Sequence, residues 1–306
     1  MIVFEQHRDF GEKINATFTF VTEQIRGLGL ALLYIVGPLA LVGGIISGYG
    51  QIELLGNATT LNSPGRLMSF YASLFSGPRL IGMVFQLLAY VLTSLVTFSY
   101  IRLYRERQGE GTIEVSAVWA EVQQYIGSGV LLSIVSAIIV GFGLVLLFFP
   151  GIYVAVALTL APAILVFERQ EVGQVVSRSF KLISGNWWST FGLLFVMGII
   201  VSIIGMVFTL PAGIVGGLFG AGVLKDVSLL ATIFTALAAV GGAILQGISA
   251  TATAFQYFSL VEENEGTGLI NQIDTIGQVP TRPGAALPGT STPGALRQTR
   301  EEEGDY

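Results

Sequence analysis

Few residues in this chain have the types and spacing that catalysis or metal binding requires. The chain has one histidine, His7, and no cysteine, so it offers neither a histidine-rich metal site nor a thiolate nucleophile or ligand. We interpret His7 as an exposed residue of the polar N-terminal segment. No phosphate-binding loop, dinucleotide fingerprint or HExxH motif is present, and the Gly-rich run 213–222 lacks the Lys-Ser/Thr of a phosphate-binding loop. We therefore expect no enzymatic activity, no cofactor and no metal.

The long apolar stretches contain uncharged polar side chains but no Asp, Glu, Lys, Arg or His. Ion and proton relays place ionisable residues at membrane depth, so a cation-coupled pump is disfavoured, while a facilitator is compatible with the sequence. We select Gln86 and Gln246 as candidate intramembrane polar contacts. Gln246, in the middle of its stretch, is interpreted either as lining a polar cavity or, more commonly for such residues, as hydrogen-bonding between helices.

A second group of candidates lies in the basic, amphipathic segment Glu168–Trp188. On a helix its apolar residues form one stripe, and Arg178 and Lys181 lie on the opposite face. A basic face with an aromatic end is typical of helices that lie flat in a membrane interface. Arg178, Lys181, Trp187 and Trp188 are therefore candidate contacts for anionic lipid headgroups, each cation contributing about 1 kcal/mol. The alternative is that they only anchor the helix. The predicted stripe is Val172, Val175, Val176, Phe180, Ile183 and Trp187.

The composition indicates a helical membrane protein. Hydrophobic residues make up 52% of the chain, charged residues 11%, and the mean hydropathy is +0.72, whereas a soluble domain has about 25% charged residues. The first 26 residues are too polar for a cleavable signal peptide, so we expect the first apolar run to act as an uncleaved insertion signal. Nothing in the composition indicates a nucleic-acid partner.

Apolar runs of about 20 residues, the length that spans a bilayer, predict six transmembrane helices in one membrane domain, residues 1–265. The run 127–167 is long enough for two spans, and Pro150-Gly151 is the predicted turn between them. A loop is predicted at Pro211 and the glycines after it. The predicted spans are about 28–49, 80–101, 127–149, 151–167, 189–210 and 227–257. Short helices are predicted at 67–75 and 268–277, and 266–306 is predicted to be a mostly disordered cytoplasmic tail.

Small residues recur every fourth position in the first span, at Ala40, Gly44 and Gly48. Such a face permits close contact between membrane helices. A second small-residue stripe, Ala239, Ala243, Gly247 and Thr251, lies in the sixth span. We expect both stripes to be packing faces.

The positions of Lys and Arg predict the orientation in the membrane. Segments 1–26, 102–126, 168–188 and 262–306 each hold three of them, whereas the opposite loops hold only Arg66, Arg79 and Lys225. Cytoplasmic segments carry the excess of Lys and Arg. Both termini are therefore predicted to be cytoplasmic.

Three amphipathic segments, 1–26, 112–126 and 168–188, share a register of apolar positions. Phe10, Ile14, Phe18, Val21 and Ile25 have the spacing of Val172, Val176, Phe180, Ile183 and Trp187, and the middle segment departs at its first position, Gly111. We interpret the chain as three tandem units, each an interfacial helix followed by a helical hairpin. The alternative is that any three amphipathic helices can be aligned in this way.

The run FFPGIYVAVALTLAPAILVFERQEVGQVVSRSFKLISGNWW resembles the membrane domain of some bacterial glycerophosphoryl diester phosphodiesterases and their stand-alone relatives. The motif residues are Pro150–Tyr153, Glu168, Ser179–Leu182 and Gly185–Trp188. The resemblance implies a multi-pass protein of the bacterial inner membrane. It does not imply phosphodiesterase activity, because in the fused relatives that chemistry belongs to a separate soluble barrel, for which this chain has no room.

Two functions remain as hypotheses. The first is a non-enzymatic scaffold or accessory protein that acts with membrane lipids, with a membrane-protein partner or as a homo-oligomer. The second is a transporter or facilitator for a lipid or small amphiphile that uses no intramembrane charge relay. A continuous polar cavity near Gln246 and Gln86 would favour the second, and a core packed solid by small residues would favour the first.

Overall fold

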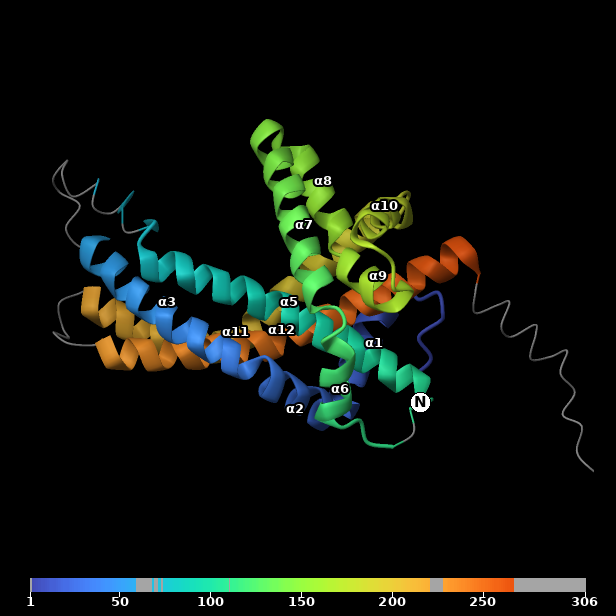
Figure 1. The fold of residues 1–306 in the computed structure, drawn as a ribbon, viewed down its shortest axis with the longest axis horizontal. Coiled ribbons are helices and arrows are strands. Elements are labelled where there is room, and N and C mark those ends of the chain that lie inside the picture. The colour runs from blue at the N-terminus through green and yellow to red at the C-terminus, as the bar shows by residue number, and fades with distance from the viewer. Residues whose placement is uncertain are drawn as a thin grey trace, which may run out of the picture. The chain divides into compact units, whose positions relative to one another are not determined.

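The computed structural model describes residues 2–58, 68, 71–72, 74–109, 111–220 and 228–266, which fold into helices with no strand among them (Figure 1). These residues belong to one unit, Met1–Gly266. Residues 267–306, which include the predicted helix at 268–277, lie outside the described residues, as do four of the nine residues of the predicted helix at 67–75. The helices are α1 (Phe10–Glu23), α2 (Ile25–Ile35), α3 (Gly37–Ala58), α5 (Gly77–Glu106), α6 (Val115–Val122), α7 (Ile126–Leu146), α8 (Phe148–Leu158), α9 (Ala161–Glu168), α10 (Val172–Ile183), α11 (Trp187–Gly220) and α12 (Ser228–Glu265).

Six helical stretches among the described residues are long and apolar enough to cross a membrane. The first joins α2 and α3 and the fourth joins α8 and α9, while α5, α7, α11 and α12 each form one stretch. The prediction of an all-helical protein with six such stretches is confirmed. The stretches are Ile25–Gly50, Gly77–Glu106, Ile126–Leu146, Phe148–Glu168, Trp187–Phe219 and Leu229–Glu265.

The turn between α7 and α8 lies at Leu147, so the prediction of a turn at Pro150-Gly151 is wrong. Leu147 has an extended backbone, with φ −151° and ψ 113°, and Pro150 falls in the first turn of α8. A proline is tolerated there because first-turn N–H groups have no partner within the helix. Gly151 instead permits close packing of the hairpin, since a Cβ there would lie 2.5 Å from the backbone nitrogen of Leu144.

Helix α11 continues through Pro211 to Gly220, so the loop predicted from Pro211 onward is wrong for residues 211–220. Membrane helices tolerate proline and glycine because neighbouring groups satisfy the freed backbone atoms. The remaining residues of the predicted loop, 221–227, lie outside the described part of the chain.

Helices α3, α5, α11 and α12 lie side by side as a bundle, and the α7–α8 hairpin leaves this bundle at an angle (Figure 1). Gly44 of α3 faces Ala236 of α12, and a Cβ at Gly44 would lie 2.6 Å from the Ala236 Cα. Only glycine allows two backbones to approach so closely. The prediction that Gly44 belongs to a packing face is therefore confirmed.

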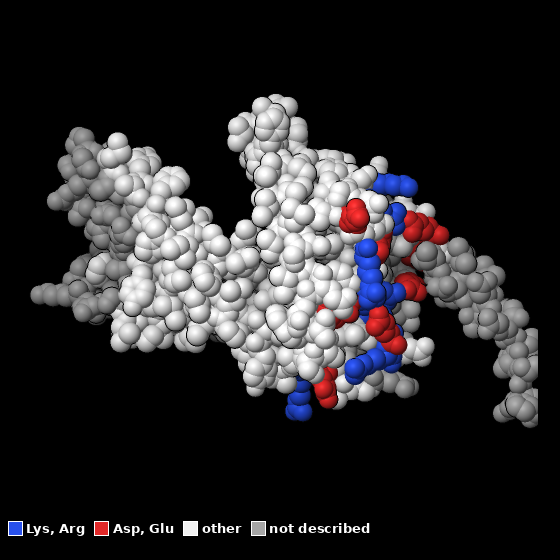
Figure 2. Space-filling view, in the orientation of Figure 1, with Lys and Arg blue, Asp and Glu red and all other residues white. Residues whose placement is uncertain are grey.

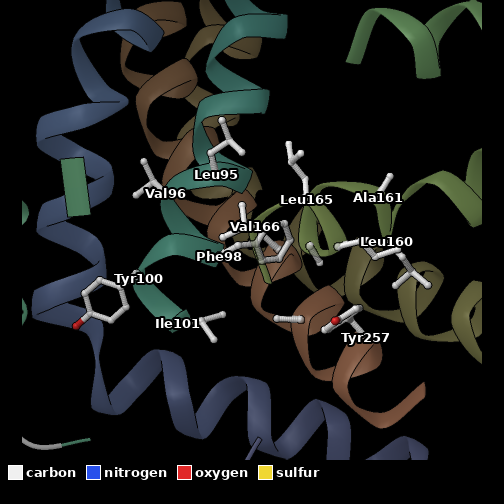
Figure 3. Close-up of a cluster of buried hydrophobic side chains, with 14 of the residues drawn as sticks. Leu95, Val96, Phe98, Tyr100, Ile101, Leu160, Ala161, Leu165, Val166 and Tyr257 are labelled. Carbon is white, nitrogen blue, oxygen red and sulfur yellow. The ribbon is translucent and has the colours of Figure 1, made fainter. Parts of the chain in front are cut away.

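The largest buried cluster lies where α5, α9 and α12 meet (Figure 3). Helix α9 is enclosed by its neighbours, and Ala161, Ile164 and Val166 are fully buried. This enclosure explains why α9 carries no polar side chain before Glu168. The residues drawn from the three helices include Leu95, Val96, Phe98, Tyr100, Ile101, Leu160, Ala161, Leu165, Val166 and Tyr257.

The charged end, as we call it, comprises the N-terminal segment, α1, the start of α2, α6 and α10, together with the adjoining ends of α5, α9 and α12. Figure 2 shows Lys, Arg, Asp and Glu side chains gathered there, while the bundle and the hairpin are uncharged on the visible face. Among the described Lys and Arg residues, only Arg79, at the start of α5, lies away from this end. The short helices therefore coincide with the segments that the sequence marks as amphipathic.

Candidate functional site

A cavity of about 310 Å³ lies between α5, α7, α8, α9, α11 and α12. Leu87 and Tyr90 of α5 and Ala137 of α7 line it and are exposed, so the cavity opens sideways between α5 and α7. Figure 2 shows the surface hollowed between the α7–α8 hairpin and the bundle. No Asp, Glu, Lys, Arg or His lines the cavity. Its polar lining is Tyr90, Ser94, Ser133, Ser136, Thr159, Gln246, Ser249 and Thr253.

Gln246 of α12 carries the cavity's largest uncharged polar group. The side chain is half-buried, and among the described residues no group hydrogen-bonds its amide. An amide in an apolar environment that lacks a partner costs about 1–3 kcal/mol. Gln86, by contrast, is exposed on α5 and does not line the cavity. The structure thus places one of the two predicted glutamines in a cavity and leaves the other outside.

Several cavity hydroxyls donate to their own helices. The Thr253 hydroxyl donates to the Ser249 carbonyl at 3.0 Å, and the Ser133 hydroxyl donates to the Gly129 carbonyl at 2.8 Å. Each hydroxyl oxygen keeps lone pairs that accept hydrogen bonds. The Ser136 and Ser249 hydroxyls have no hydrogen-bonding partner within the part of the chain described. The lining therefore offers both donors and acceptors without a charge.

A break between α8 and α9 contributes to the same cavity. Helix α8 ends at Leu158, and Pro162 is the second residue of α9. Because proline has no N–H, the Leu158 carbonyl lacks its usual helical donor. Leu158, Thr159 and Pro162 all line the cavity. Non-helical backbone at membrane depth is tolerated where it is buried in protein or lines a cavity.

Two networks of charged side chains connect the helices at the charged end. Glu168 is at the centre of the first network. The Arg178 Nε donates to Glu168 Oε1 at 3.1 Å, and the Tyr257 hydroxyl donates to the same oxygen at 2.9 Å. Arg178 also pairs with Glu265 at 2.6 Å. Burial works against the charge of Arg178, but hydrogen bonds to Glu265 and Glu168 outweigh it and raise the pKa of Arg178. These contacts join α9, α10 and α12.

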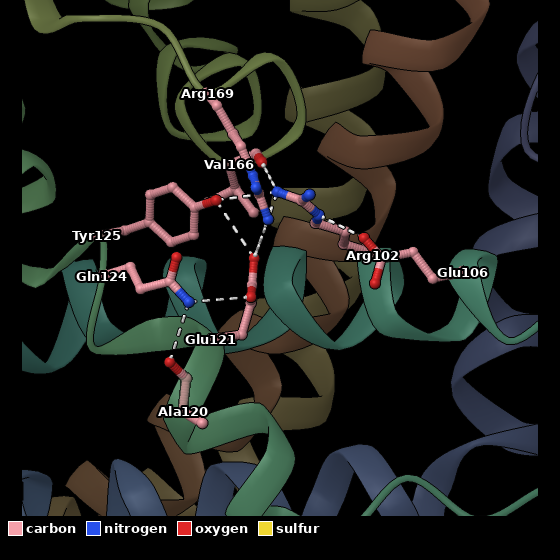
Figure 4. A network of polar contacts seen from close by, with 8 residues as sticks. All are labelled: Arg102, Glu106, Ala120, Glu121, Gln124, Tyr125, Val166 and Arg169. Atoms are coloured by element: carbon pink, nitrogen blue, oxygen red, sulfur yellow. Dashed lines mark hydrogen bonds and ion pairs between the residues drawn. The ribbon is translucent and has the colours of Figure 1, made fainter.

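The second network is centred on Glu121 of α6 (Figure 4). Arg102 of α5 pairs with Glu121 at 3.3 Å, and Arg169, just after α9, pairs with it at 3.4 Å. The Arg102 guanidinium also donates to the Val166 carbonyl at 3.0 Å and to the Tyr125 oxygen at 2.9 Å. Burial raises the pKa of Tyr125, so its hydroxyl keeps the proton that it donates to Glu121.

The N-terminal segment before α1 packs into the charged end. Phe4 is 3% exposed and stacks on Phe255 of α12, with ring centroids 5.0 Å apart. The Arg8 guanidinium donates to the Phe4 carbonyl at 3.1 Å, and burial lowers the pKa of Arg8 against the pull of Glu12. Arg105 pairs with Glu5. This segment therefore covers the contact between α5 and α12.

The four predicted headgroup contacts have different surroundings. Arg178 is paired within the protein, whereas Lys181 is exposed. Trp187 donates its Nε1–H to the Tyr153 carbonyl at 3.2 Å and stacks on the Tyr153 ring. Trp188 is 77% exposed. Lys181 and Trp188 are thus the two of the four that are free to contact lipid.

The residues that carry the family resemblance hold α8, α9 and α10 together. Ser179 donates to the Ala157 carbonyl beside the break between α8 and α9. Gly185, with φ +86°, turns the chain from α10 towards α11, and Glu168 centres the first network. Glu168 and Ser179 are motif residues that the sequence identifies. Their partners, Tyr257 and Ala157, could not be predicted because they lie 89 and 22 positions away along the chain.

The fold and the cavity define a multi-pass helical membrane protein with an uncharged polar site between its helices. No family model, curated protein or solved structure matches the chain. The function of the protein is therefore inferred from the geometry of the site.

Proposed function

We propose that the protein is a non-enzymatic membrane protein that binds a lipid or small amphiphile in the cavity and allows it to move between the bilayer and the protein. The observation that carries the proposal is the unpaired Gln246 amide in a cavity that opens sideways between α5 and α7. Ligand pockets are mostly apolar, with a few convergent polar groups. The absence of charge from the cavity lining fits a facilitator that needs no ion relay.

The proposal includes an orientation. The charged end lies in the cytoplasm, and α1, α6 and α10 lie in the cytoplasmic interface of a bacterial inner membrane. Support comes from the concentration of described Lys and Arg residues at this end. The exposed Lys181 and Trp188 of the α10–α11 junction then contact lipid headgroups, while the two networks close the cytoplasmic side.

The proposal also includes the tandem repeat, and kinship with the membrane-domain family that the motif resembles. Helices α1 and α10 bury equivalent positions of the shared register. Lys13, Thr17 and Phe20 are buried in α1, and the equivalent residues Val175, Ser179 and Leu182 are buried in α10. Helix α10 also buries Ile183, whose equivalent in α1, Val21, is half-buried. Helix α6 follows this pattern only in part, since it buries Val118 and Val122. Equivalent burial supports a common origin more strongly than the apolar spacing alone.

A second candidate function, a scaffold for a partner protein or a homo-oligomer, is favoured by the bundle. Gly44 and Gly82 bring α3 into tight contact with α12 and α5, and a Cβ at Gly82 would lie 2.5 Å from the Ser47 hydroxyl oxygen. Such a bundle is a rigid support. The cavity, however, is a feature that a scaffold does not need.

A matched pair of phenylalanine substitutions tests the proposed function. Ser136 lines the cavity, and Ile138 lies on the same helix, is 65% exposed and does not line it. The two variants and the unaltered protein are purified in native nanodiscs and their bound lipids are quantified by mass spectrometry. We expect S136F to lose a lipid that I138F retains. Equal lipid content in all three proteins would overturn the proposal.

A further inference from the structure

We propose that the ligand is an uncharged amphiphile with a small, hydroxyl-bearing headgroup, of the acylglycerol class. This inference rests on the proposed function and names the ligand of the same cavity. Three observations carry it: the lack of charge in the lining, the unpaired amide and hydroxyls, and the size and opening of the cavity.

The lining excludes a charged headgroup. All eight polar residues of the cavity offer a hydroxyl or, at Gln246, an amide. Along α5, the cavity residue Ser94 lies eight positions before Arg102, a separation of about 12 Å at the rise of an α-helix. Arg102 itself is engaged by Glu106, Glu121 and Val166. A phosphate in the cavity would therefore be buried without a counter-charge, which is strongly unfavourable.

The unpaired groups require a partner that both donates and accepts hydrogen bonds. The Gln246 amide has an acceptor oxygen and two donor hydrogens, and the Ser136 and Ser249 hydroxyls can do either. A hydrocarbon chain would leave all three unpaired at membrane depth. Hydroxyl and ester groups satisfy both requirements and carry no charge.

The size and opening of the cavity point to a small headgroup that enters from the bilayer. About 310 Å³ is at the lower end of the range of roughly 300–1,000 Å³ for small-molecule sites. The mouth is formed by the exposed apolar residue Leu87 and by the exposed Tyr90, whose ring is amphipathic. A ligand dissolved in the bilayer can therefore pass its headgroup through the mouth while its chain remains in lipid.

The test uses a monoacylglycerol that carries its photoreactive group at the ester end of the acyl chain, next to the headgroup, reconstituted with the protein in nanodiscs. Unlabelled monoolein and oleoyl lysophosphatidic acid, which share the acyl chain and the glycerol and differ by one charged phosphate, compete with the probe. We expect labelled peptides from α5, α7 and α12, and competition by monoolein that is at least about tenfold stronger than that by the charged lipid. Gln246→Leu should reduce this ratio, and Gln86→Leu, outside the cavity, should leave it unchanged.

The outcomes separate this inference from the proposed function. If both lipids compete equally and S136F abolishes labelling, the cavity binds amphiphiles but the uncharged class is wrong. Stronger competition by the charged lipid would also overturn the class. If the probe labels only residues outside the cavity, or if S136F and I138F are labelled alike, the proposed function fails as well. The competition on the unaltered protein remains decisive even where the Gln246 variant does not fold.

Discussion

The hydroxyl of Ser179, in α10, donates a hydrogen bond to the carbonyl of Ala157, one residue before α8 ends. Ser179 is fully buried, so the contact joins an amphipathic helix at the charged end to the helix break that borders the cavity. The structure thus connects the segment with the basic face to the candidate binding site through a single side chain.

We expect Ser179→Ala to lower the free energy of unfolding by about 1–3 kcal/mol, because the Ala157 carbonyl loses a donor in a buried position. Ser177, on the exposed face of the same helix, provides the matched control, and Ser177→Ala should change stability by less than about 0.5 kcal/mol. Unfolding in mixed micelles measures both. Equal effects of the two substitutions would contradict a structural role for Ser179.

Glu168→Gln should destabilise the protein by about 2 kcal/mol, because it removes the charge that pairs with Arg178 while the arginine stays partly buried. Glu168 and Arg178 are each 17% exposed in the side chain. Glu23→Gln, at an exposed position, is the control. In a double-mutant cycle, Arg178→Gln should cost less in the Glu168→Gln background than alone. Additive effects would mean that the two side chains do not stabilise each other.

Trp187 and Trp188 are neighbours with different roles, and their alanine variants should differ. Trp187→Ala removes the stack on Tyr153 and Phe191 and should cost about 3 kcal/mol. Trp188, mostly exposed, should lose less than half as much stability. Its indole fluorescence, measured after Trp119 and Trp187 are replaced by Phe, should be quenched by lipids brominated near the headgroup. Quenching only by lipids brominated deep in the chain would contradict the proposed interfacial position.

Lys13 predicts a pH dependence of stability. It is 5% exposed, and its burial, opposed by Glu263 and Asp9, lowers its pKa below 10.5. Between this lowered pKa and 10.5, the unfolded chain binds more protons than the folded protein. The free energy of unfolding contributed by Lys13 therefore rises with pH across that window.

Lys13→Met isolates this contribution. The variant should equal or exceed the unaltered protein in stability at pH 8, and its advantage should shrink as the pH approaches 10.5. Comparing the two proteins at each pH removes the effect of other titrating groups. A stability difference that is constant over this range would exclude a lowered pKa for Lys13.

The absence of cysteine makes the proposed orientation testable with single-cysteine variants. Ser184→Cys, exposed after α10, should react with a membrane-impermeant maleimide only after the cytoplasmic side is made accessible. Phe75→Cys, which is exposed before the start of α5, lies at the opposite end of that helix from Arg102 and should react in intact cells. The reverse pattern would invert the topology.

Hydropathy was sufficient to predict the six apolar stretches, because spanning length depends on local composition alone. The breaks predicted at Pro150 and Pro211 were wrong, because both prolines lie within helices. Tertiary packing decides whether a proline ends a helix. The site was predicted only in part. Gln246 could be selected as a polar residue in an apolar run, but its cavity requires six helices to meet. The pairing of Arg178 with Glu265 could not be predicted because the two residues lie 87 positions apart.

The lengths of α7 and α11 have a further consequence. Helix α7 has 21 residues, about 31 Å at the α-helical rise, whereas the 34 residues of α11 extend about 51 Å. A hydrocarbon layer of about 30 Å matches the first and is much too thin for an upright second helix. Helix α11 must therefore tilt, kink or project beyond a hydrocarbon layer that α7 matches while upright. A thicker bilayer favours a less tilted α11, so we expect the acyl-chain length of the surrounding lipids to affect how α11 packs against the rest of the protein.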